Sequence, residues 1–318
     1  MHEVLSGIDL RSVWQNLFPH LRPTLLLAPE RLSKALGVRV RLASETLQHT
    51  GSFKYRAALA AAQNLPASHL LTASSGNFGA ALALAARESG KACTVVMPST
   101  SARVKITAVA SFGAAVDLVD TSRKTRAARV AELAETLSDV AVVSAYDDPF
   151  VIAGNASLGA EVFAADPTDV VVVPVGGGGL SSGIVVARNE LAPDVRVIGA
   201  EPHLANDAAR SLREGRLVAN DSEPPTICDG ARTLSLGSRN FAILREGLED
   251  IAEVEEEAVE RAVRMLFELA NLKVEPTGAL AVAAVLQSPS RFAGKSVTCV
   301  VSGGNVDAEL YARLLESA

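Results

Sequence analysis

Four consecutive glycines, Gly176 to Gly179, follow the apolar run Val170–Val175 and precede a segment of helical character that begins at Leu180. Glycines between a strand and a helix let backbone N–H groups converge on an anion at the positive end of the helix. A phosphate site is therefore favoured here over a plain flexible turn. The alternative of a dinucleotide fingerprint, GxGxxG, is weakened because its two registers place Ser181 or Ser182 at the third glycine.

A lysine that could act as a nucleophile lies in the segment TGSFKYRAA. Lys54 follows Phe53 and stands at the start of an apolar helical pattern. Burial would lower the pKa of its amine and make the amine nucleophilic, as formation of a Schiff base requires. Lysines at helix starts are usually solvated, so the residue type alone does not decide between the two roles.

Two further segments place small polar residues where a predicted strand ends. TASSGNFGA contains Ser74, Ser75 and Asn77 at the start of a predicted helix, which indicates either an ordinary N-cap or a cradle for a carboxylate. VVSGGN ends a strand at Ser302 before two glycines, which alone is typical of a tight turn.

The elements that must position these residues alternate along the chain. Short β-branched runs alternate with Ala- and Leu-rich segments of helical spacing, which predicts an α/β fold with mostly parallel sheets. The predicted strands are Val38–Leu42, Leu70–Ala73, Ala92–Met97, Ala115–Val119, Val140–Ser144, Val170–Val175, Val195–Ala200 and Ser296–Val301. The predicted helices are Phe53–Gln63, Gly76–Ser89, Arg103–Phe112, Arg123–Leu137, Asn155–Ala165, Leu180–Glu190, Glu255–Asn271 and Thr277–Leu286.

Composition excludes several classes of protein. The 318 residues are 48% hydrophobic and 21% charged, enough apolar material for one large domain or two modest ones. The net charge of -6 and the absence of a basic tract argue against a nucleic-acid or anionic membrane partner. Three widely spaced cysteines without a CxxC pattern indicate neither a disulfide framework nor a zinc cluster. We expect a cytoplasmic protein with no membrane segment.

Taken in order, the motifs GSFK, SSGNFG, GGGGL and SGGN resemble those of the fold-type II pyridoxal-phosphate enzymes, which share the fold of the tryptophan synthase β chain. The resemblance is greatest to the branch of serine/threonine dehydratases and serine racemases. It implies a large cofactor-binding domain of residues 1–69 and 147–318, a small substrate-loop domain of residues 70–146, pyridoxal 5'-phosphate as cofactor, and a homodimer.

The resemblance also implies roles for individual residues. Lys54 is the expected catalytic residue, forming the Schiff base and then moving the substrate Cα proton. A serine at the ring nitrogen, unlike a carboxylate, does not keep that nitrogen protonated and makes the ring a weaker electron sink. The implied cofactor contacts are Phe53 against the ring, Asn77 at the 3'-oxygen, Gly176, Gly177, Gly178, Gly179 and Leu180 at the phosphate, and Ser302 at the ring nitrogen.

The same resemblance places the substrate carboxylate on the loop after the strand Leu70–Ala73. Ser75 has a second implied catalytic role, as a base on the face opposite Lys54 that would permit racemisation. Some dehydratases carry the same loop, so Ser75 alone does not separate the two activities. The implied substrate contacts are Ser74, Ser75, Gly76, Asn77 and Phe78.

A divalent cation is implied by the racemase-like branch. Its ligands would be the carboxylates of Glu201 and Asp207 and the backbone carbonyl of Ala205. Oxygen ligands of this kind suit Mg²⁺, Mn²⁺ or Ca²⁺. The alternative is that both acids are ordinary exposed loop residues.

The activity that this resemblance implies is α,β-elimination from an L-3-hydroxy amino acid such as serine or threonine, giving a 2-oxo acid and ammonia. Phe78 stands where these enzymes commonly carry histidine, which leaves a bulkier 3-hydroxy amino acid open as substrate. Racemisation of serine or another amino acid also stays open. β-Replacement is less favoured, because those enzymes usually place threonine at the position of Phe78.

Overall fold

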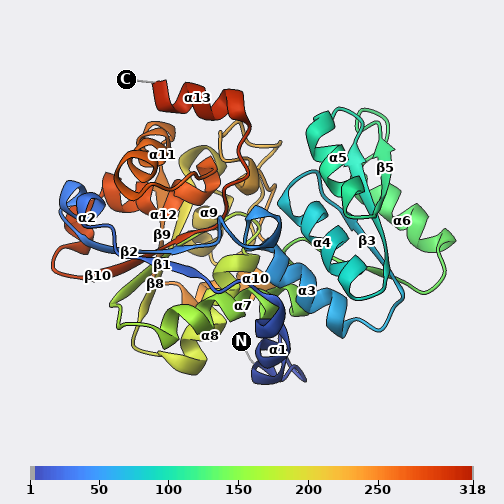
Figure 1. Ribbon diagram of the computed structural model, residues 1–318, viewed down its shortest axis with the longest axis horizontal. Coiled ribbons are helices and arrows are strands. Elements are labelled where there is room, and N and C mark those ends of the chain that lie inside the picture. The colour runs from blue at the N-terminus through green and yellow to red at the C-terminus, as the bar shows by residue number, and fades with distance from the viewer. Residues whose placement is uncertain (1–3, 317–318) are drawn as a thin grey trace.

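The structure is a computed structural model that describes residues 4–316 and contains two β-sheets with helices on their faces (Figure 1). The larger sheet has six strands in the order β1-β2-β10-β7-β8-β9. β1 pairs antiparallel with β2, and the other neighbours pair parallel. Its strands are β1 (Leu25–Leu27), β2 (Arg39–Ser44), β7 (Val170–Pro174), β8 (Arg196–Pro202), β9 (Asp250–Val254) and β10 (Ser296–Val301).

The smaller sheet is parallel throughout and forms the right-hand lobe in Figure 1. Its order is β5-β4-β3-β6, and its strands come from one continuous stretch of chain. The predicted domain division at residues 70–146 follows this sheet closely and stays a prediction. The strands are β3 (His69–Ala73), β4 (Ala92–Pro98), β5 (Ala115–Val119) and β6 (Val140–Val142).

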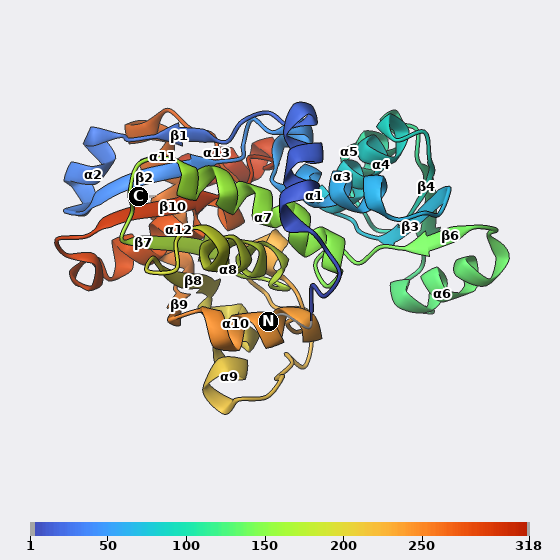
Figure 2. The same ribbon diagram turned by 90° about the horizontal axis from the view of Figure 1, so that it is seen from below.

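Helices cover both faces of the large sheet and flank the small one (Figures 1 and 2). The helices of the described residues are α1 (Leu10–Leu17), α2 (Glu30–Leu36), α3 (Lys54–Asn64), α4 (Asn77–Glu88), α5 (Arg103–Ser111), α6 (Arg126–Thr136), α7 (Pro149–Ala164), α8 (Gly179–Leu191), α9 (Asp207–Glu214), α10 (Ser238–Gly247), α11 (Glu256–Ala270), α12 (Pro276–Gln287) and α13 (Ala308–Glu316).

The central strand β7 explains why the large sheet is covered on both faces. All its residues are buried, and successive side chains of a strand point to opposite faces. Val171 and Val173 join one apolar cluster, with residues of α7 and α8, while Val170 and Val172 join the other, with residues of α11 and α12. The α/β fold with mostly parallel sheets is thus confirmed.

Each predicted strand and helix corresponds to an observed one; the strands Ala115–Val119 and Ser296–Val301 match at both ends, and the other elements have shifted ends. The largest error is the predicted helix Asn155–Ala165, because α7 begins at Pro149. Asp148 caps that helix by accepting the N–H groups of Phe150 and Val151, at 2.8 and 3.1 Å, and proline is favoured in a first turn. The strands β1 and β9 and the helices α1, α2, α9, α10 and α13 were not predicted.

Among residues 4–316, no helix combines the length and hydropathy needed to cross a bilayer.

A buried cation fixes α3 to the large sheet and to α7. Arg56 has no exposed surface, and its guanidinium contacts Glu45 at 2.7 Å and Glu161 at 2.6 Å. It also donates to the hydroxyls of Thr24, at 2.8 Å, and Ser157, at 3.1 Å. Two carboxylates and two hydroxyls offset the cost of burying this charge. The network therefore fixes the position of α3, the helix that begins at Lys54.

Removal of this cation should destabilise the fold strongly. Arg56→Met would leave Glu45, which is 1% exposed, buried without its partner, and we expect the free energy of unfolding to fall by about 3–5 kcal/mol. Urea denaturation measures the change. The control Arg196→Met removes a half-exposed pair with Glu249 and should cost much less. Equal losses in the two variants would contradict this account of Arg56.

Candidate active site

Two motifs far apart in the sequence are hydrogen-bonded to each other. The segment that leads into α3 and the segment that follows β10 meet at an isolated antiparallel bridge between Ser52 and Gly303. The N–H of Phe53 donates to the carbonyl of Ser302 at 3.0 Å. The GSFK and SGGN motifs therefore lie side by side, and Lys54 follows the bridged Ser52 by two residues.

Lys54 is a half-buried residue whose amine is held by a backbone carbonyl. Its Nζ donates to the carbonyl of Ala145 at 2.8 Å and lies 5.0 Å from the ring centroid of Phe53 and 5.7 Å from that of Phe78. Burial lowers the pKa of Lys54 to about 8, against a smaller opposing effect of Glu275. A neutral amine is therefore accessible near physiological pH, as a nucleophile or a base requires.

The loop between β3 and α4 offers unpaired backbone donors. The Oγ of Ser74 accepts the N–H groups of Gly76, at 3.3 Å, and Gly79, at 3.1 Å, so this side chain already caps α4. Within the described residues, the N–H groups of Ser75, Asn77 and Phe78 donate to no acceptor. Free N–H groups at a helix start suit a carboxylate.

The side-chain amide of Asn77 is oriented by hydrogen bonds at both its nitrogen and its oxygen. Its amide nitrogen donates to both carboxylate oxygens of Glu275, at 2.9 and 3.1 Å. Its amide oxygen accepts from Asn305 at 2.8 Å, and the same nitrogen of Asn305 donates to the carbonyl of Thr50 at 2.7 Å. The chain of contacts fixes the direction of the Asn77 amide between the two lobes.

Glu275 is an acid held in an environment that disfavours its charge. Burial, reinforced by the nearby Asp229, raises its pKa to about 8, while its bond with Asn77 and the charge of Lys105 act in the opposite direction. Lys105 of α5 itself contacts Asp229 at 3.2 Å, which joins the two lobes by an ion pair. Glu275 was not predicted as a site residue, although its place before a proline in an apolar segment was a usable signal.

The glycine run forms an open nest of donors at the start of α8. Among the described residues, no backbone N–H group from Gly176 through Ser181 donates to an acceptor. Gly178 has φ +92°, and a Cβ on Gly177 would lie 2.4 Å from the ring of Tyr146. Side chains are thus excluded, and the donors lie at the positive end of a 13-residue helix. A phosphate group fits this chemistry.

The predicted cofactor residues fit pyridoxal phosphate as a set. A phosphate site, a buried amine and an aromatic wall are the groups that such a cofactor would need. Ser302 is 2% exposed and directly follows β10, and its backbone carbonyl is bonded to Phe53, so a serine lies next to the residue expected against the ring.

The two predicted metal-binding acids are buried, which contradicts the alternative of exposed loop acids. Glu201 and Asp207 are each 1% exposed. Glu201 accepts the N–H groups of Ala208, at 3.0 Å, and Ala209, at 2.9 Å. Asp207 accepts from Asn220 at 2.8 Å through one oxygen, and its other oxygen is buried without a partner. Burial and mutual repulsion raise the pKa of Glu201, and burial raises that of Asp207 to about 7.

An unpartnered carboxylate oxygen beside a second buried acid is an environment that a cation would suit. No cluster of three or more His, Cys, Asp or Glu side chains that could hold a metal occurs in residues 4–316. The predicted set has only two acids, with the backbone carbonyl of Ala205 as its third ligand.

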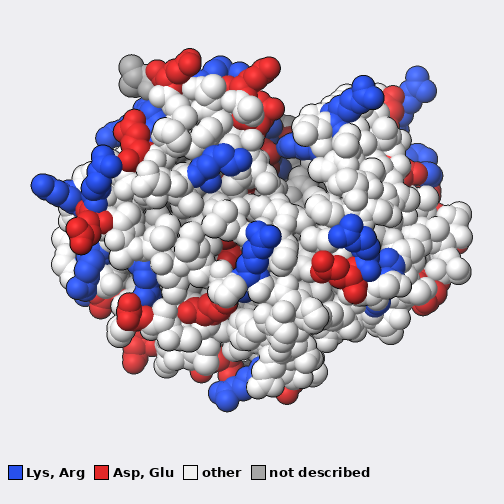
Figure 3. Space-filling model, in the orientation of Figure 1, with Lys and Arg blue, Asp and Glu red and all other residues white. Residues whose placement is uncertain are grey.

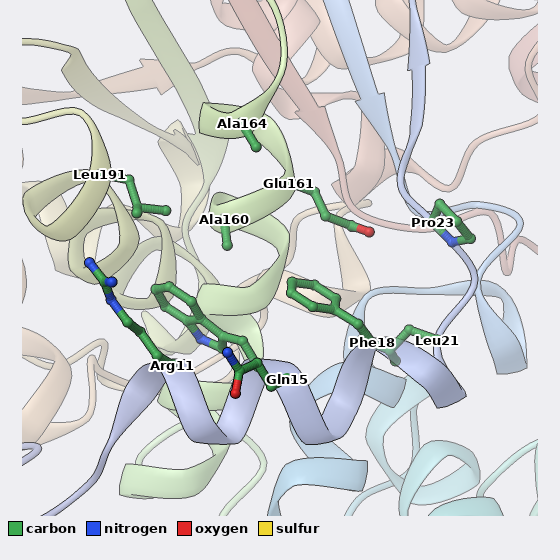
Figure 4. A pocket seen from close by; sticks show the side chains of 10 residues that line it. Arg11, Gln15, Phe18, Leu21, Pro23, Ala160, Glu161, Ala164 and Leu191 are labelled. Atoms are coloured by element: carbon green, nitrogen blue, oxygen red, sulfur yellow. The ribbon is translucent and has the colours of Figure 1, made fainter.

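A separate apolar groove lies between α1 and α7 (Figure 4). It encloses about 530 Å³ and is lined by residues such as Trp14, Phe18 and Leu191. None of its lining residues belongs to the site around Lys54. The space-filling view, in the orientation of Figure 1, shows a hollow between the lobe of the large sheet and the lobe of the small sheet (Figure 3).

Comparison with known proteins agrees with this geometry. L-threo-3-hydroxyaspartate ammonia-lyase of Pseudomonas sp is 34% identical over 99% of this chain and 98% of its own length. Serine racemase of Schizosaccharomyces pombe is 33% identical over 96% of each chain. The crystal structure of T.th. threonine deaminase has a TM-score of 0.90 and 40% identity, covering 94% of this chain and 98% of that one. The profile of the family described as pyridoxal-phosphate dependent enzyme matches residues 17–303, and the chain therefore belongs to that family.

Proposed function

We propose that this protein catalyses the α,β-elimination of an L-3-hydroxy amino acid to a 2-oxo acid and ammonia. The observation that carries the proposal is the buried amine of Lys54, whose pKa is lowered to about 8 and which bonds a carbonyl rather than a carboxylate. The relatives named above act on 3-hydroxyaspartate, serine or threonine, which supports a hydroxylated amino acid as substrate.

In this proposal the cofactor is held by the residues identified from the sequence. Gly176 to Gly179 and Leu180 would donate N–H groups to its phosphate, and Asn77 would donate to its 3'-oxygen. Phe53 would pack on its ring, and Ser302 would contact its ring nitrogen. When bound, pyridoxal phosphate supplies the electron sink that acidifies the Cα–H of an attached amino acid.

The protein's own groups then orient the substrate and move one proton. The free N–H groups of Ser75, Asn77 and Phe78 would bind the substrate carboxylate at the start of α4. The neutral amine of Lys54 would take the Cα proton, and loss of the β-hydroxyl as water follows. A hydroxyl at Ser302, unlike a carboxylate, would not keep the ring nitrogen protonated, which would favour rapid loss of the β-hydroxyl over transamination.

Racemisation is the second candidate function. Serine racemases are among the relatives, and the hydroxyl of Ser75 accepts and donates no hydrogen bond in residues 4–316. A base on the face opposite Lys54 would return the proton with inversion. The substrate side chain would meet the ring of Phe78, which is 1% exposed and faces Lys54.

We also propose a divalent cation, Mg²⁺, Mn²⁺ or Ca²⁺, at Glu201, Asp207 and the carbonyl of Ala205. The unpartnered oxygen of Asp207 supports this proposal. The cation would neutralise two buried acids beside the start of α9. The homodimer and the cytoplasmic location expected from the sequence stay predictions.

A panel of 3-hydroxyaspartate, serine and threonine tests the function by ammonia release and by the enantiomer composition of the remaining amino acid. Lys54→Ala should lower turnover by more than about 1,000-fold, because it removes both the attachment point and the base. Lys295→Ala, at an exposed lysine, is the control. Ser75→Ala should keep ammonia release and lose any D-enantiomer. Full turnover in Lys54→Ala would refute the proposal.

The amine of Lys54 should react at unusually low pH. In the cofactor-free protein, its acetylation by acetic anhydride, followed by mass spectrometry of the peptide that contains it, should rise with a midpoint near pH 8. An ordinary lysine titrates near about 10.4. Since the charge of Glu275 raises the pKa of Lys54, Glu275→Gln should move the midpoint lower. A midpoint at the ordinary value, or an upward shift in the variant, would contradict the assignment.

Cation binding should stabilise the protein. At a concentration of 100 times Kd, Mg²⁺, Mn²⁺ or Ca²⁺ should add about 2.7 kcal/mol to the free energy of unfolding and raise Tm by several degrees, relative to protein in a chelator. Asp207→Asn should remove the increase, whereas Asp194→Asn, at a residue outside the site, should retain it. If all three proteins show the same Tm with and without cation, no such site exists.

A further inference from the structure

The glycine nest is open to an anion because its carbonyls are bound elsewhere. The carbonyl of Gly177 accepts the N–H of Gly237 at 3.1 Å and the side-chain amide of Asn240 at 2.8 Å. The carbonyl of Gly178 accepts from Ser181 and Ser182. Because the C=O and N–H of a trans peptide point in opposite directions, the N–H groups of Gly178 and Gly179 point away from these donors and are left for a ligand.

Asn240 makes this contact from a fully buried position. It has no exposed surface, and a Cβ on Gly178 would lie 2.7 Å from the Cβ of Asn240. The helix α10 thus packs directly against the glycine run. Within the described residues, the side-chain oxygen of Asn240 has no donor, so the residue contributes here through its two N–H hydrogens.

The second contact of the same amide is to the segment that joins the lobes. The Nδ2 of Asn240 also donates to the carbonyl of Tyr146 at 2.9 Å. The preceding carbonyl, that of Ala145, is the acceptor of Lys54. The carboxamide of Asn240 therefore joins the glycine run to the Ala145–Tyr146 segment, whose Ala145 carbonyl holds the amine of Lys54.

The first turn of α10 is fixed to that same segment. Asp147 accepts the N–H groups of Ser238, at 3.1 Å, and Arg239, at 3.0 Å, at the start of the helix. A Cβ on Gly237 would lie 2.3 Å from the carboxyl carbon of Asp147, so the helix start and the segment are in close contact. The backbone of Asn240 is thereby held in place independently of its side chain.

We infer that Asn240 is a positioning residue for the cofactor phosphate: its carboxamide holds the glycine nest and the Ala145–Tyr146 segment in register, so that the phosphate site and the amine of Lys54 face one cofactor. This inference rests on the proposed function, since it takes the phosphate of pyridoxal phosphate as the anion. In this inference Asn240 contacts neither the cofactor nor the substrate and acts only through the glycine run and the Ala145–Tyr146 segment.

The test compares two cofactor forms that differ only in the phosphate. The dissociation constants of the cofactor-free protein for pyridoxal 5'-phosphate and for pyridoxal are measured by absorbance, and the constant for pyridoxal divided by that for pyridoxal 5'-phosphate reports the contribution of the phosphate. Asn240→Leu removes both donors while it keeps the number and branching of the side-chain heavy atoms, and it should lower this ratio at least about tenfold, with the constant for pyridoxal changed by less than about twofold. Inorganic phosphate should compete more weakly by the same factor.

Two further variants keep the test decisive. Asn240→Thr retains one donor and should give an intermediate ratio, and it decides the question if Asn240→Leu does not fold. Ser238→Ala, in the same helical turn but without contact to the glycine run, should leave the ratio unchanged.

An unchanged ratio in Asn240→Leu and Asn240→Thr, or a parallel loss for both cofactor forms, would overturn the inference. Failure of the unaltered protein to bind pyridoxal 5'-phosphate would refute the proposed function instead.

Discussion

The site depends on the removal of one amine from water. A buried ammonium is costly, and Lys54 has a backbone carbonyl and two aromatic rings around it rather than a bonded carboxylate. The nearby acid, Glu275, is itself buried and bonded to Asn77, so it offsets only part of that cost. The low dielectric surroundings thus keep the amine close to neutrality, and every role given to Lys54 follows from this balance.

The fold produces these surroundings by bringing distant segments to one edge of the large sheet. Parallel strands end at the same edge, and the turns after β7 and β10 lie there together. The turn after β10 pairs with the segment before α3, and the turn after β7 begins α8. Arg56, two residues after Lys54, anchors α3 through a network that reaches Glu45, the residue after β2, and Glu161 of α7. Stability and chemistry are therefore concentrated in one helix.

Much of this architecture could be predicted from the sequence, because buried parallel strands are continuous β-branched runs and the helices between them are rich in alanine. β1 and β9 escaped prediction because three leucines and the mixed run DIAEV carry no clear period. The motifs indicated Lys54, the glycine run and Ser302. Asn240 carried no signal in the sequence and Glu275 only that of an acid before a proline, since the contacts of both join segments that only the folded chain brings together.

Covalent labelling tests the role of Lys54 most directly. The protein is loaded with pyridoxal phosphate, reduced with sodium borohydride, digested and mapped by mass spectrometry. We expect a single labelled peptide, modified at the ε-nitrogen of Lys54. Label on another lysine, or no label at all, would contradict the assignment of Lys54 as the residue that binds the cofactor.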